Sequence, residues 1–387
     1  MKDAILVLNA GSSSIKLTLF DMDLTERLSG AVDAIGGAAR LRIGSDTRLL
    51  DIPDHVTALE EIFASLAQQG VTIDTLRAVG HRVVHGGSRL TGPQRLTSEI
   101  RAEIEACVPL APLHNRLNLV AIDMVGELAP QLPQFASFDT AFHATNPELA
   151  TRYALPADHA ARGVRRYGFH GLSYSALVHN LPALSGQPLP RHLLACHLGN
   201  GASLCAIQDG VSVATTMGYS PVEGLTMGTR AGCIDANAVL RLVEEDGLEA
   251  TRRLLNRRAG LLGLSGLSAD MRTLSGDDSP RSAFAIAHFC YWAARHAGSM
   301  IAAMGGCDAI AFTGGIGENA ADIRADILQR LGWLDVRIDP VLNVGGGPRL
   351  HTEDSQLTAW VVAADEEREI ARDALRLLQG AGDEPAA

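Results

Sequence analysis

Several patterns that would assign the chain to a common class of protein are missing from its 387 residues. Its six cysteines are scattered and include no Cys-x-x-Cys pair, so we expect no zinc site or disulfide framework, but reduced thiols in a cytoplasmic protein. Met1-Lys2-Asp3 leads directly into an apolar run, so we expect no signal peptide. The absence of Gly-x4-Gly-Lys-Ser/Thr excludes a Walker-type nucleotide site, and protein-kinase signatures are also absent.

Positive charge is also scarce. The chain has 33 Lys and Arg against 44 Asp and Glu, and its net charge of −11 predicts no general affinity for nucleic acid or an anionic membrane surface. An anionic ligand would therefore need a local basic pocket. The apolar run 283–304 contains His288, Arg295 and His296, which are costly in lipid, so it predicts a long buried helix. The length allows two domains with substantial cores.

The first informative pattern covers residues 5–20. An apolar run ends in Asn-Ala-Gly-Ser-Ser-Ser (9–14), and an alternating run containing Lys16 follows. This order predicts a β-hairpin with a small, polar tip. Such a tip lets main-chain N–H groups and hydroxyls approach an anion, and Lys16 adds a cation, although an ordinary hairpin turn has the same pattern.

Residues 193–207 repeat this design around a Gly-Asn-Gly-Ala-Ser tip (199–203). An acidic turn follows each hairpin, at Asp21 and at Asp209-Gly210. Two similar loops about half a chain apart suggest two related lobes that close on one nucleotide. The alternative is a coincidence of two hairpins.

Predicted strands and helices alternate along the chain, which indicates an α/β protein. Residues 215–235 are rich in Gly, Met and Thr without periodicity and predict a functional loop, while 380–387 predict a frayed tail. The expected strands are 76–84, 134–138, 308–312 and 359–363, and the expected helices are 55–69, 97–107, 117–129, 236–245, 248–258, 282–304 and 366–379.

Four side chains stand where phosphate chemistry would need them. Arg82 and Arg230 are flanked by glycine-containing segments, and arginine binds phosphoryl oxygens in bidentate fashion, although a surface salt bridge is the alternative for each. Asp139 follows a predicted buried strand, where α/β folds place ligand sites; a helix N-cap is its other interpretation. His170 fits either a site or a buried core histidine.

Eight motifs together make the sequence resemble the acetate kinase family, in the family's order and over nearly the whole chain. The resemblance implies a two-lobed, duplicated ribonuclease-H-like (actin-like ATPase) α/β fold with mixed sheets flanked by helices. It places one lobe at 1–139 plus about 369–387 and the other at 140–368. The motifs are LNAGSSSIK (8–16), GHRVVHGG (80–87), FDTAFH (138–143), RYGFHG (166–171), HLGNG (197–201), GTR (228–230), DMR (270–272) and GIGEN (315–319).

The resemblance also implies a role for individual residues. Asp139, His170 and Arg230 would be catalytic, and Asn9 and Glu366 would lie at a Mg²⁺ site, with Mn²⁺ as an alternative ion. The acyl substrate would contact Arg82, Val84, Leu113, His114, Phe169 and Pro221. ATP or ADP would contact Lys16, His197, Leu198, Gly199, Asn200, Gly201, Asp270, Met271, Arg272, Gly314, Gly315, Ile316, Gly317, Glu318 and Asn319.

Asp139 corresponds to the family's acid/base residue, but the chemistry favours another role. A carboxylate substrate is already deprotonated at neutral pH and needs no strong base, so we expect Asp139 to orient Arg82 or the metal. The family's small apolar pocket discriminates one methylene by only about 1–3 kcal/mol, which leaves acetate and propionate unresolved.

Three positions depart from the family pattern. Cys233 replaces the usual aspartate in the Gly-Asp-Ile-Asp that follows the transition-state arginine, which would loosen Arg230 or leave a more reactive thiol. Arg116-Leu117 replaces two prolines, and Leu172 replaces a threonine. None of these removes a residue implied to bind phosphate or metal.

The leading hypothesis is reversible, ATP-dependent phosphorylation of acetate to acetyl phosphate by direct in-line transfer with Mg²⁺. A propionate-preferring kinase is the alternative among enzymes, and a non-catalytic ATP-gated protein of the actin or Hsp70 kind is the alternative from another class. The resemblance implies a homodimer, to which the 283–304 helix would contribute.

Overall fold

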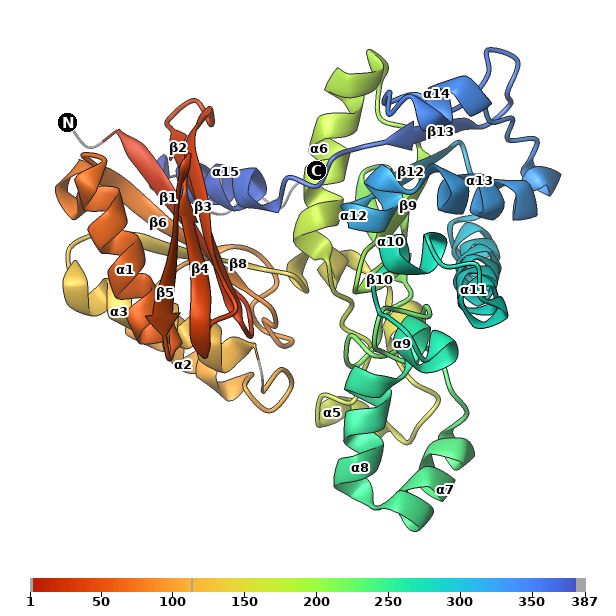
Figure 1. The fold of residues 1–387 in the computed structure, drawn as a ribbon, viewed down its shortest axis with the longest axis horizontal. Helices are drawn as coiled ribbons and strands as arrows, with labels where there is room; N and C mark the ends of the chain where they lie inside the picture. The colour runs from red at the N-terminus through yellow and green to blue at the C-terminus, as the bar shows by residue number, and fades with distance from the viewer. Residues whose placement is uncertain (1–2, 113, 381–387) are drawn as a thin grey trace. The chain divides into compact units, whose positions relative to one another are not determined.

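The computed structural model describes residues 3–112 and 114–380 (Figure 1). Leu113, expected in the substrate pocket, and residues 381–387 of the expected tail lie outside this part. The chain divides into two compact units, Met1–Phe142 with Asp365–Ala387, and His143–Ala364. These boundaries lie a few residues from those implied by the resemblance, and Glu366 belongs to the first unit.

The first unit is built on an eight-stranded sheet in the order β5-β4-β3-β2-β1-β6-β8-β7. Strands β1 to β5 each pair antiparallel with the next strand along the chain, whereas β6 pairs in parallel with both β1 and β8. The strands are β1 Ala4–Ala10, β2 Ser14–Asp21, β3 Glu26–Asp33, β4 Gly37–Ile43, β5 Asp46–Ile52, β6 Leu76–Val83, β7 Gln94–Arg95 and β8 Gln134–Phe138.

Helices cover both faces of this sheet. On one face, α1 (His55–Gln68) packs on β2, β4 and β5, and α3 (Asn115–Leu128) packs on β1 and β6. Helix α2 (Ser98–Ala106) packs on α3. On the other face lies α15 (Glu366–Leu378), whose Ile370 comes so close to β6 that a Cβ added at Gly80 would be 2.7 Å from it. Glycine at position 80 therefore lets α15 dock.

The second unit repeats the central strand order of the first. Its sheet is β11-β10-β9-β12-β13, with antiparallel pairs on one side of β9 and parallel β12 and β13 on the other, as for β3-β2-β1-β6-β8. The expected hairpins are β1–β2 and β9–β10, which occupy equivalent places. The strands are β9 His192–Leu198, β10 Ala202–Gln208, β11 Val211–Thr215, β12 Ala309–Thr313 and β13 Thr358–Val361.

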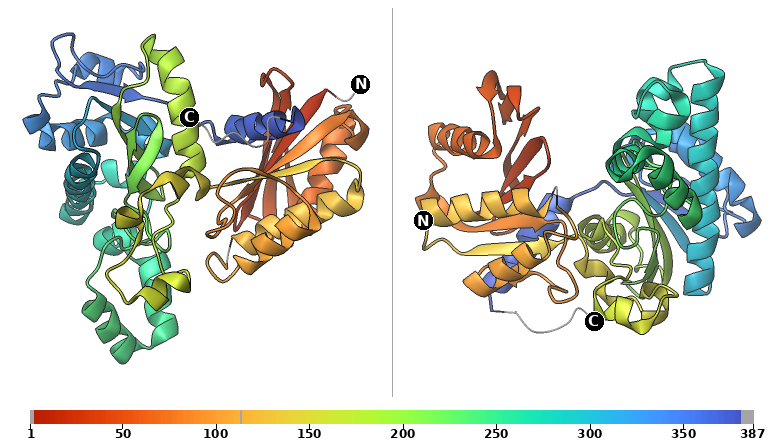
Figure 2. Two further views of the ribbon diagram at one scale, coloured as in Figure 1. Left: turned by 180° about the vertical axis from the view of Figure 1, so that it is seen from behind. Right: turned by 90° about the horizontal axis from the view of Figure 1, so that it is seen from below.

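Helices α6 (Gly171–Ser185) and α11 (Pro280–Met304) lie on opposite sides of this sheet (Figures 1 and 2). The long α11 buries its apolar side against β10 and β11 and neighbouring helices, as expected of 282–304. No helix in the described ranges is both long and apolar enough to cross a membrane. The other helices are α4 Glu148–Thr151, α5 Ala157–Ala161, α7 Ala236–Asp246, α8 Leu248–Arg253, α9 Gly260–Ser265, α10 Met271–Ser275, α12 Gly314–Asn319, α13 Ala321–Arg330 and α14 Pro340–Val344.

Candidate functional site

In the first unit, neighbouring parallel strands bring Arg82 and Asp139 together. Arg82 on β6 is in register with Ser137 on β8, so Asp139, just beyond β8, lies beside it. The guanidinium donates two hydrogen bonds to the carboxylate, from Nε to Oδ1 (3.0 Å) and from Nη2 to Oδ2 (2.6 Å). The side chain of Asp139 is only 2% exposed, so this is a buried bidentate pair rather than a surface salt bridge.

Three further side chains surround the same guanidinium. Nη1 of Arg82 donates to Asn9 Oδ1 (3.3 Å) and lies 3.8 Å from Glu366 Oε2. Asn9 in turn donates from Nδ2 to Glu367 Oε1 (3.5 Å). The end of β1 and the start of α15 therefore supply oxygen ligands around a fixed cation.

The charges in this cluster are interdependent. Burial raises the pKa of the Asp139 carboxyl, and the Arg82 guanidinium opposes that shift. Burial alone would lower the pKa of Arg82, but the charges of Asp139 and Glu366 raise it, which keeps the guanidinium positive. Arg82 is thus a permanent, oriented cation that an anionic substrate can bind.

Two buried asparagines on α3 shape the loop that follows Arg82. Asn118 Oδ1 accepts from the Val84 amide (3.2 Å), and Asn115 accepts from the His85 amide (3.1 Å) and donates to the His85 carbonyl (2.9 Å). These contacts fix the backbone at Val84, one of the residues expected at the acyl group. His114, expected to contact the same substrate, directly precedes α3.

In the second unit, a glycine tip lies against two of the expected catalytic groups. A Cβ added at Gly201, between β9 and β10, would be 3.2 Å from His170 Nε2 and 3.4 Å from Arg230 Nη1. His170 also stacks on His197, with ring centroids 4.1 Å apart. The structure therefore gathers the tip, His170 and Arg230 at one place.

Arg230 is partly buried without a carboxylate to balance its charge. Nη1 donates to the Pro221 carbonyl (3.3 Å) and lies 3.9 Å from Met227 Sδ, and no ion pair to Arg230 is found within residues 3–112 and 114–380. Burial lowers the pKa of Arg230. Cys233, where the resemblance implies an aspartate, is exposed and is not a carboxylate. An anionic ligand would complete the pairing of this guanidinium.

The backbone before His170 is held in an uncommon conformation. His170 itself has φ of 60°, and Gly168 has φ of 81°, where an added Cβ would be 2.5 Å from the His143 ring. Burial lowers the pKa of His143 to about 4, so its ring is neutral at pH 7; Nε2 contacts the Phe169 carbonyl (2.9 Å) and Nδ1 contacts Ser212 Oγ (2.8 Å). His143 thus supports the turn that presents His170.

The Gly-rich segment after β12 forms the short helix α12. Glu318 Oε1 accepts from the amides of Gly314 (2.9 Å) and Ala364 (3.0 Å), which closes this segment onto the chain after β13. The buried Arg324 donates to the carbonyls of Gly317 (2.9 Å) and Glu318 (2.8 Å). Gly315 has no atom within 4 Å of an added Cβ, so its surface is open to a flat ring.

Of the remaining nucleotide-binding candidates, Met271 is buried at the start of α10, whereas Arg272 and Lys16 are exposed. Asp270 caps α10 by accepting from the Arg272 amide (2.9 Å) and pairs with the exposed Arg272 side chain (2.6 Å). Lys16 is exposed on β2, paired across the hairpin with Asn9. Asn200 accepts at its carbonyl from the Gly228 amide (2.9 Å), which joins the second hairpin tip to the segment that carries Arg230.

The acyl-pocket candidates are divided between the units. Val84 and His114 belong to the first, and the buried Phe169 and partly exposed Pro221 to the second. The sequence predicted no contact with site residues or their neighbouring loops for the side chains of Asn115, Asn118, Ser203 and Tyr174. A polar residue on an otherwise apolar face was the available signal for the two asparagines.

We expect Gly201→Ala to lower kcat about tenfold, because a displacement of under an ångström in a positioned group is costly. The new methyl would crowd His170 and Arg230, while the backbone at position 201 suits any residue. Steady-state kinetics would test this, with Gly298→Ala as the control, since nothing lies within 4 Å of a Cβ there. Equal kcat values for the two variants would contradict the expectation.

Known proteins resemble this chain over nearly its whole length. The profile of the acetokinase family matches residues 4–372. The chain belongs to the acetokinase family. Membership of this family implies that ATP or ADP is a co-substrate and that acetate is the phosphoryl acceptor.

Similar proteins cover the chain almost completely. It is 43% identical to the acetate kinase of Rhodopseudomonas palustris over 98% of this chain and 100% of that one. The Porphyromonas gingivalis acetate kinase structure superimposes with a TM-score of 0.89 at 36% identity, covering 97% and 100% of the two chains. The structure of a Francisella tularensis propionate kinase superimposes with a TM-score of 0.91 at 33% identity. The match covers 96% of this chain and 98% of that one. These likenesses confirm the expected ribonuclease-H-like, actin-like ATPase fold.

Proposed function

We propose that the protein transfers the γ-phosphoryl group of ATP to acetate, and from acetyl phosphate to ADP in reverse, by direct in-line displacement. The observation that carries this proposal is Arg230, a partly buried cation without a carboxylate partner in the described ranges, held beside His170 at a glycine tip. Such a group suits an anion whose charge changes during the reaction.

The acceptor would bind at Arg82. Asp139 holds the guanidinium by two hydrogen bonds and Asn9 accepts from Nη1, so the cation that would meet a carboxylate or acyl phosphate has a fixed orientation. The acceptor oxygen is already ionised at neutral pH, and Asp139 is engaged with Arg82 rather than poised to take a proton. Asp139 therefore acts as an orienting residue, and positioning of the acceptor supplies most of its contribution.

His170 and Arg230 would stabilise the transferring phosphoryl group from the second unit. Main-chain amides of the tip that contains His197, Leu198, Gly199, Asn200 and Gly201 would bind the ATP phosphates, because glycine leaves those amides accessible. Lys16 would add a cation. The segments 270–272 and 314–319 would hold the nucleoside.

Asn9 and Glu366 fit a Mg²⁺ site of the kind that completes its shell with water and phosphate. They provide an amide and a carboxylate, hard oxygen ligands that Mg²⁺ prefers, and Glu367 lies beside Asn9. No cluster of three or more His, Cys, Asp or Glu able to hold a metal occurs in the described ranges, so substrate phosphates and water would have to complete the shell. When bound, the ion would neutralise charge on the β- and γ-phosphates.

Propionate is a second candidate acceptor, favoured by the high structural similarity to the Francisella tularensis propionate kinase. Val84, His114, Phe169 and Pro221 would set the acyl-group size, and a pocket of this kind separates homologues by about 1–3 kcal/mol per methylene. We also retain the homodimer and the cytoplasmic location as part of this proposal, on the family resemblance alone.

Trapping acyl phosphate with hydroxylamine would test the function. We expect ATP-dependent hydroxamate formation in the series formate to butyrate, with the maximum at acetate and none without a carboxylate. A maximum at propionate would select the second candidate. ATP binding without hydroxamate from any acid would reject both and favour the non-catalytic, ATP-gated alternative.

A further inference from the structure

We propose that Tyr174 and Ser203 are positioning residues that hold His170 with its proton on Nε2, so that the neutral ring still donates a hydrogen bond to the transferring phosphoryl group. This inference rests on the proposed function for its consequence in catalysis. The hydrogen-bond chain itself is a property of the second unit and can be tested without turnover.

The fold places these three side chains together for simple geometric reasons. Ser203 on β10 is the cross-strand partner of His197 on β9, so their side chains share one face of the hairpin. His170 stacks on His197 and its Nδ1 lies 2.8 Å from Ser203 Oγ. Tyr174 is four residues after His170 at the start of α6, which brings both to one side of the helix.

The hydrogen-bond chain has a direction. The phenol oxygen of Tyr174 lies 2.5 Å from Ser203 Oγ, and either oxygen could donate in this contact. We assign the phenol as the donor, because a phenol is more acidic than a serine hydroxyl and the hydroxyl can then pass a hydrogen bond onward. The Ser203 hydroxyl then donates to His170 Nδ1, which leaves the imidazole proton on Nε2.

Nε2 is the ring nitrogen that faces the site. A Cβ added at Gly201 would lie 3.2 Å from His170 Nε2 and 3.4 Å from Arg230 Nη1. Donors on Nε2 and Nη1 would therefore be offered to the same anion. The opposite tautomer would present a lone pair there and repel phosphoryl oxygens.

Because its side chains are buried, the hydrogen-bond chain should be sensitive to the loss of one hydroxyl. Tyr174 and Ser203 are both fully buried, and burial raises the pKa of Tyr174 well above its usual value, so the phenol stays a donor at all working pH. Buried donors and acceptors depend on their few partners because water cannot replace them. Tyr174→Phe removes one oxygen and keeps the ring that packs edge-on against His143.

The test uses full-length protein labelled with ¹⁵N-histidine, with the His170 signals assigned from their loss in His170→Ala. We expect the wild-type imidazole shifts to report the Nε2–H tautomer, and Tyr174→Phe and Ser203→Ala each to increase the Nδ1–H fraction. We expect kcat to fall on the order of tenfold in each, less than the roughly 10²–10³-fold cost of losing a whole donor, with KM for ATP nearly unchanged.

Tyr291→Phe is the matched control, because Tyr291 is exposed on α11. This variant should change neither the His170 tautomer nor kcat. An Nδ1–H tautomer in the wild type would overturn the inference. Imidazole shifts and kcat values equal to those of the wild type in both Tyr174→Phe and Ser203→Ala would also overturn it. If only one of these variants folds, the result for that variant decides. Absence of acyl phosphate formation by the wild type would instead reject the proposed function, and the tautomer measurement would still decide the hydrogen-bond chain.

Discussion

Replacing Arg230 with alanine should lower kcat for acetyl phosphate formation by roughly 10³-fold or more, the scale of an arginine that stabilises a transferring phosphoryl group. The guanidinium has no carboxylate partner within the described ranges, so the change removes a cation without leaving an uncompensated acid. We therefore expect the free energy of unfolding to stay within about 1 kcal/mol of the wild type. Stopped-time hydroxamate assays and urea denaturation would measure the two quantities.

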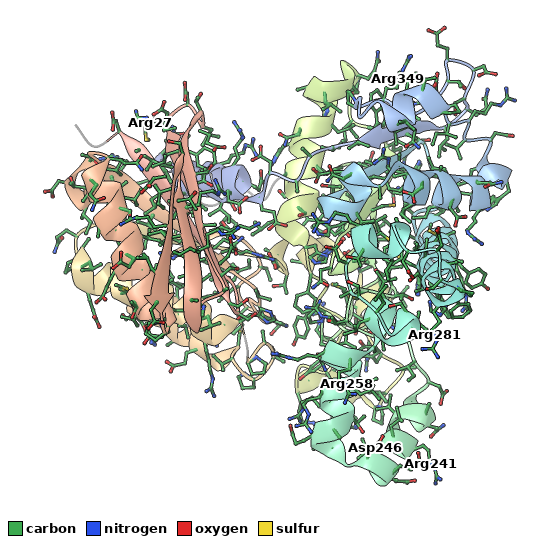
Figure 3. All side chains as sticks on the ribbon, in the orientation of Figure 1. Arg27, Arg241, Asp246, Arg258, Arg281 and Arg349 are labelled. Carbon is green, nitrogen blue, oxygen red and sulfur yellow. The ribbon has the colours of Figure 1, made fainter. Side chains whose placement is uncertain are left out.

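Two further substitutions separate charge from geometry in this prediction. Arg230→Lys keeps the charge but loses the planar fork, so it should recover only part of the lost rate. Arg241→Ala removes an arginine from the exposed surface of α7, where it pairs with Glu244 and Glu245, and should leave kcat unchanged (Figure 3). Equal kcat for Arg230→Ala and Arg241→Ala would contradict the role assigned to Arg230.

Arg82→Met should affect both activity and stability, unlike Arg230→Ala. We expect kcat/KM for acetate to fall about 10²–10³-fold because the acceptor loses its cation. We also expect the variant to lose about 3 kcal/mol of unfolding free energy at pH 7, since a buried Asp139 is left without its partner. Activity assays and urea denaturation of the same preparations would show both effects.

The stability loss in Arg82→Met should depend on pH in a defined direction. Burial raises the pKa of Asp139, and removing Arg82 takes away the charge that opposes this shift. A raised pKa in the folded state favours the protonated, folded form at low pH, so the loss should shrink as pH falls from 7 toward about 4.

The double variant Arg82→Met/Asp139→Leu should regain most of the stability while remaining inactive, because no buried charge is left unpaired. A single variant as stable as the wild type at pH 7, or a double variant with restored activity, would contradict this account of the pair.

The sequence predicts most of the fold because the elements that build the two sheets have clear periodicity. The apolar run and alternation at 5–20 define the β1–β2 hairpin, and the expected strand 134–138 coincides with β8. The short helices α9 and α10 were not predicted. The expected helix 248–258 is helical only as α8 to Arg253, after which 254–258 is π-helical. Pieces of five or six residues contain too few turns for a periodic signal.

The site shows the same division between what local pattern determines and what the fold determines. The motifs mark Arg82, His170 and Arg230, but the bidentate bond to Asp139 depends on the pairing of β6 with β8, and Ser203 reaches His170 only through the register of β9 with β10. Strand register is a long-range property, which one sequence read along its length does not contain. The replacement at Cys233 could be noticed in the sequence because it is local, and its predicted effect on Arg230 stays a prediction.

Binding of a transition-state mimic would test most directly the proposal that both Arg82 and Arg230 take part in phosphoryl transfer. Isothermal titration calorimetry would measure ADP binding with Mg²⁺, aluminium fluoride and acetate present together. We predict that acetate tightens binding of the mimic to the wild type, and that Arg82→Met and Arg230→Ala each weaken this complex at least tenfold while keeping their affinity for ADP alone. Wild-type affinity for the mimic in either variant would contradict the claim.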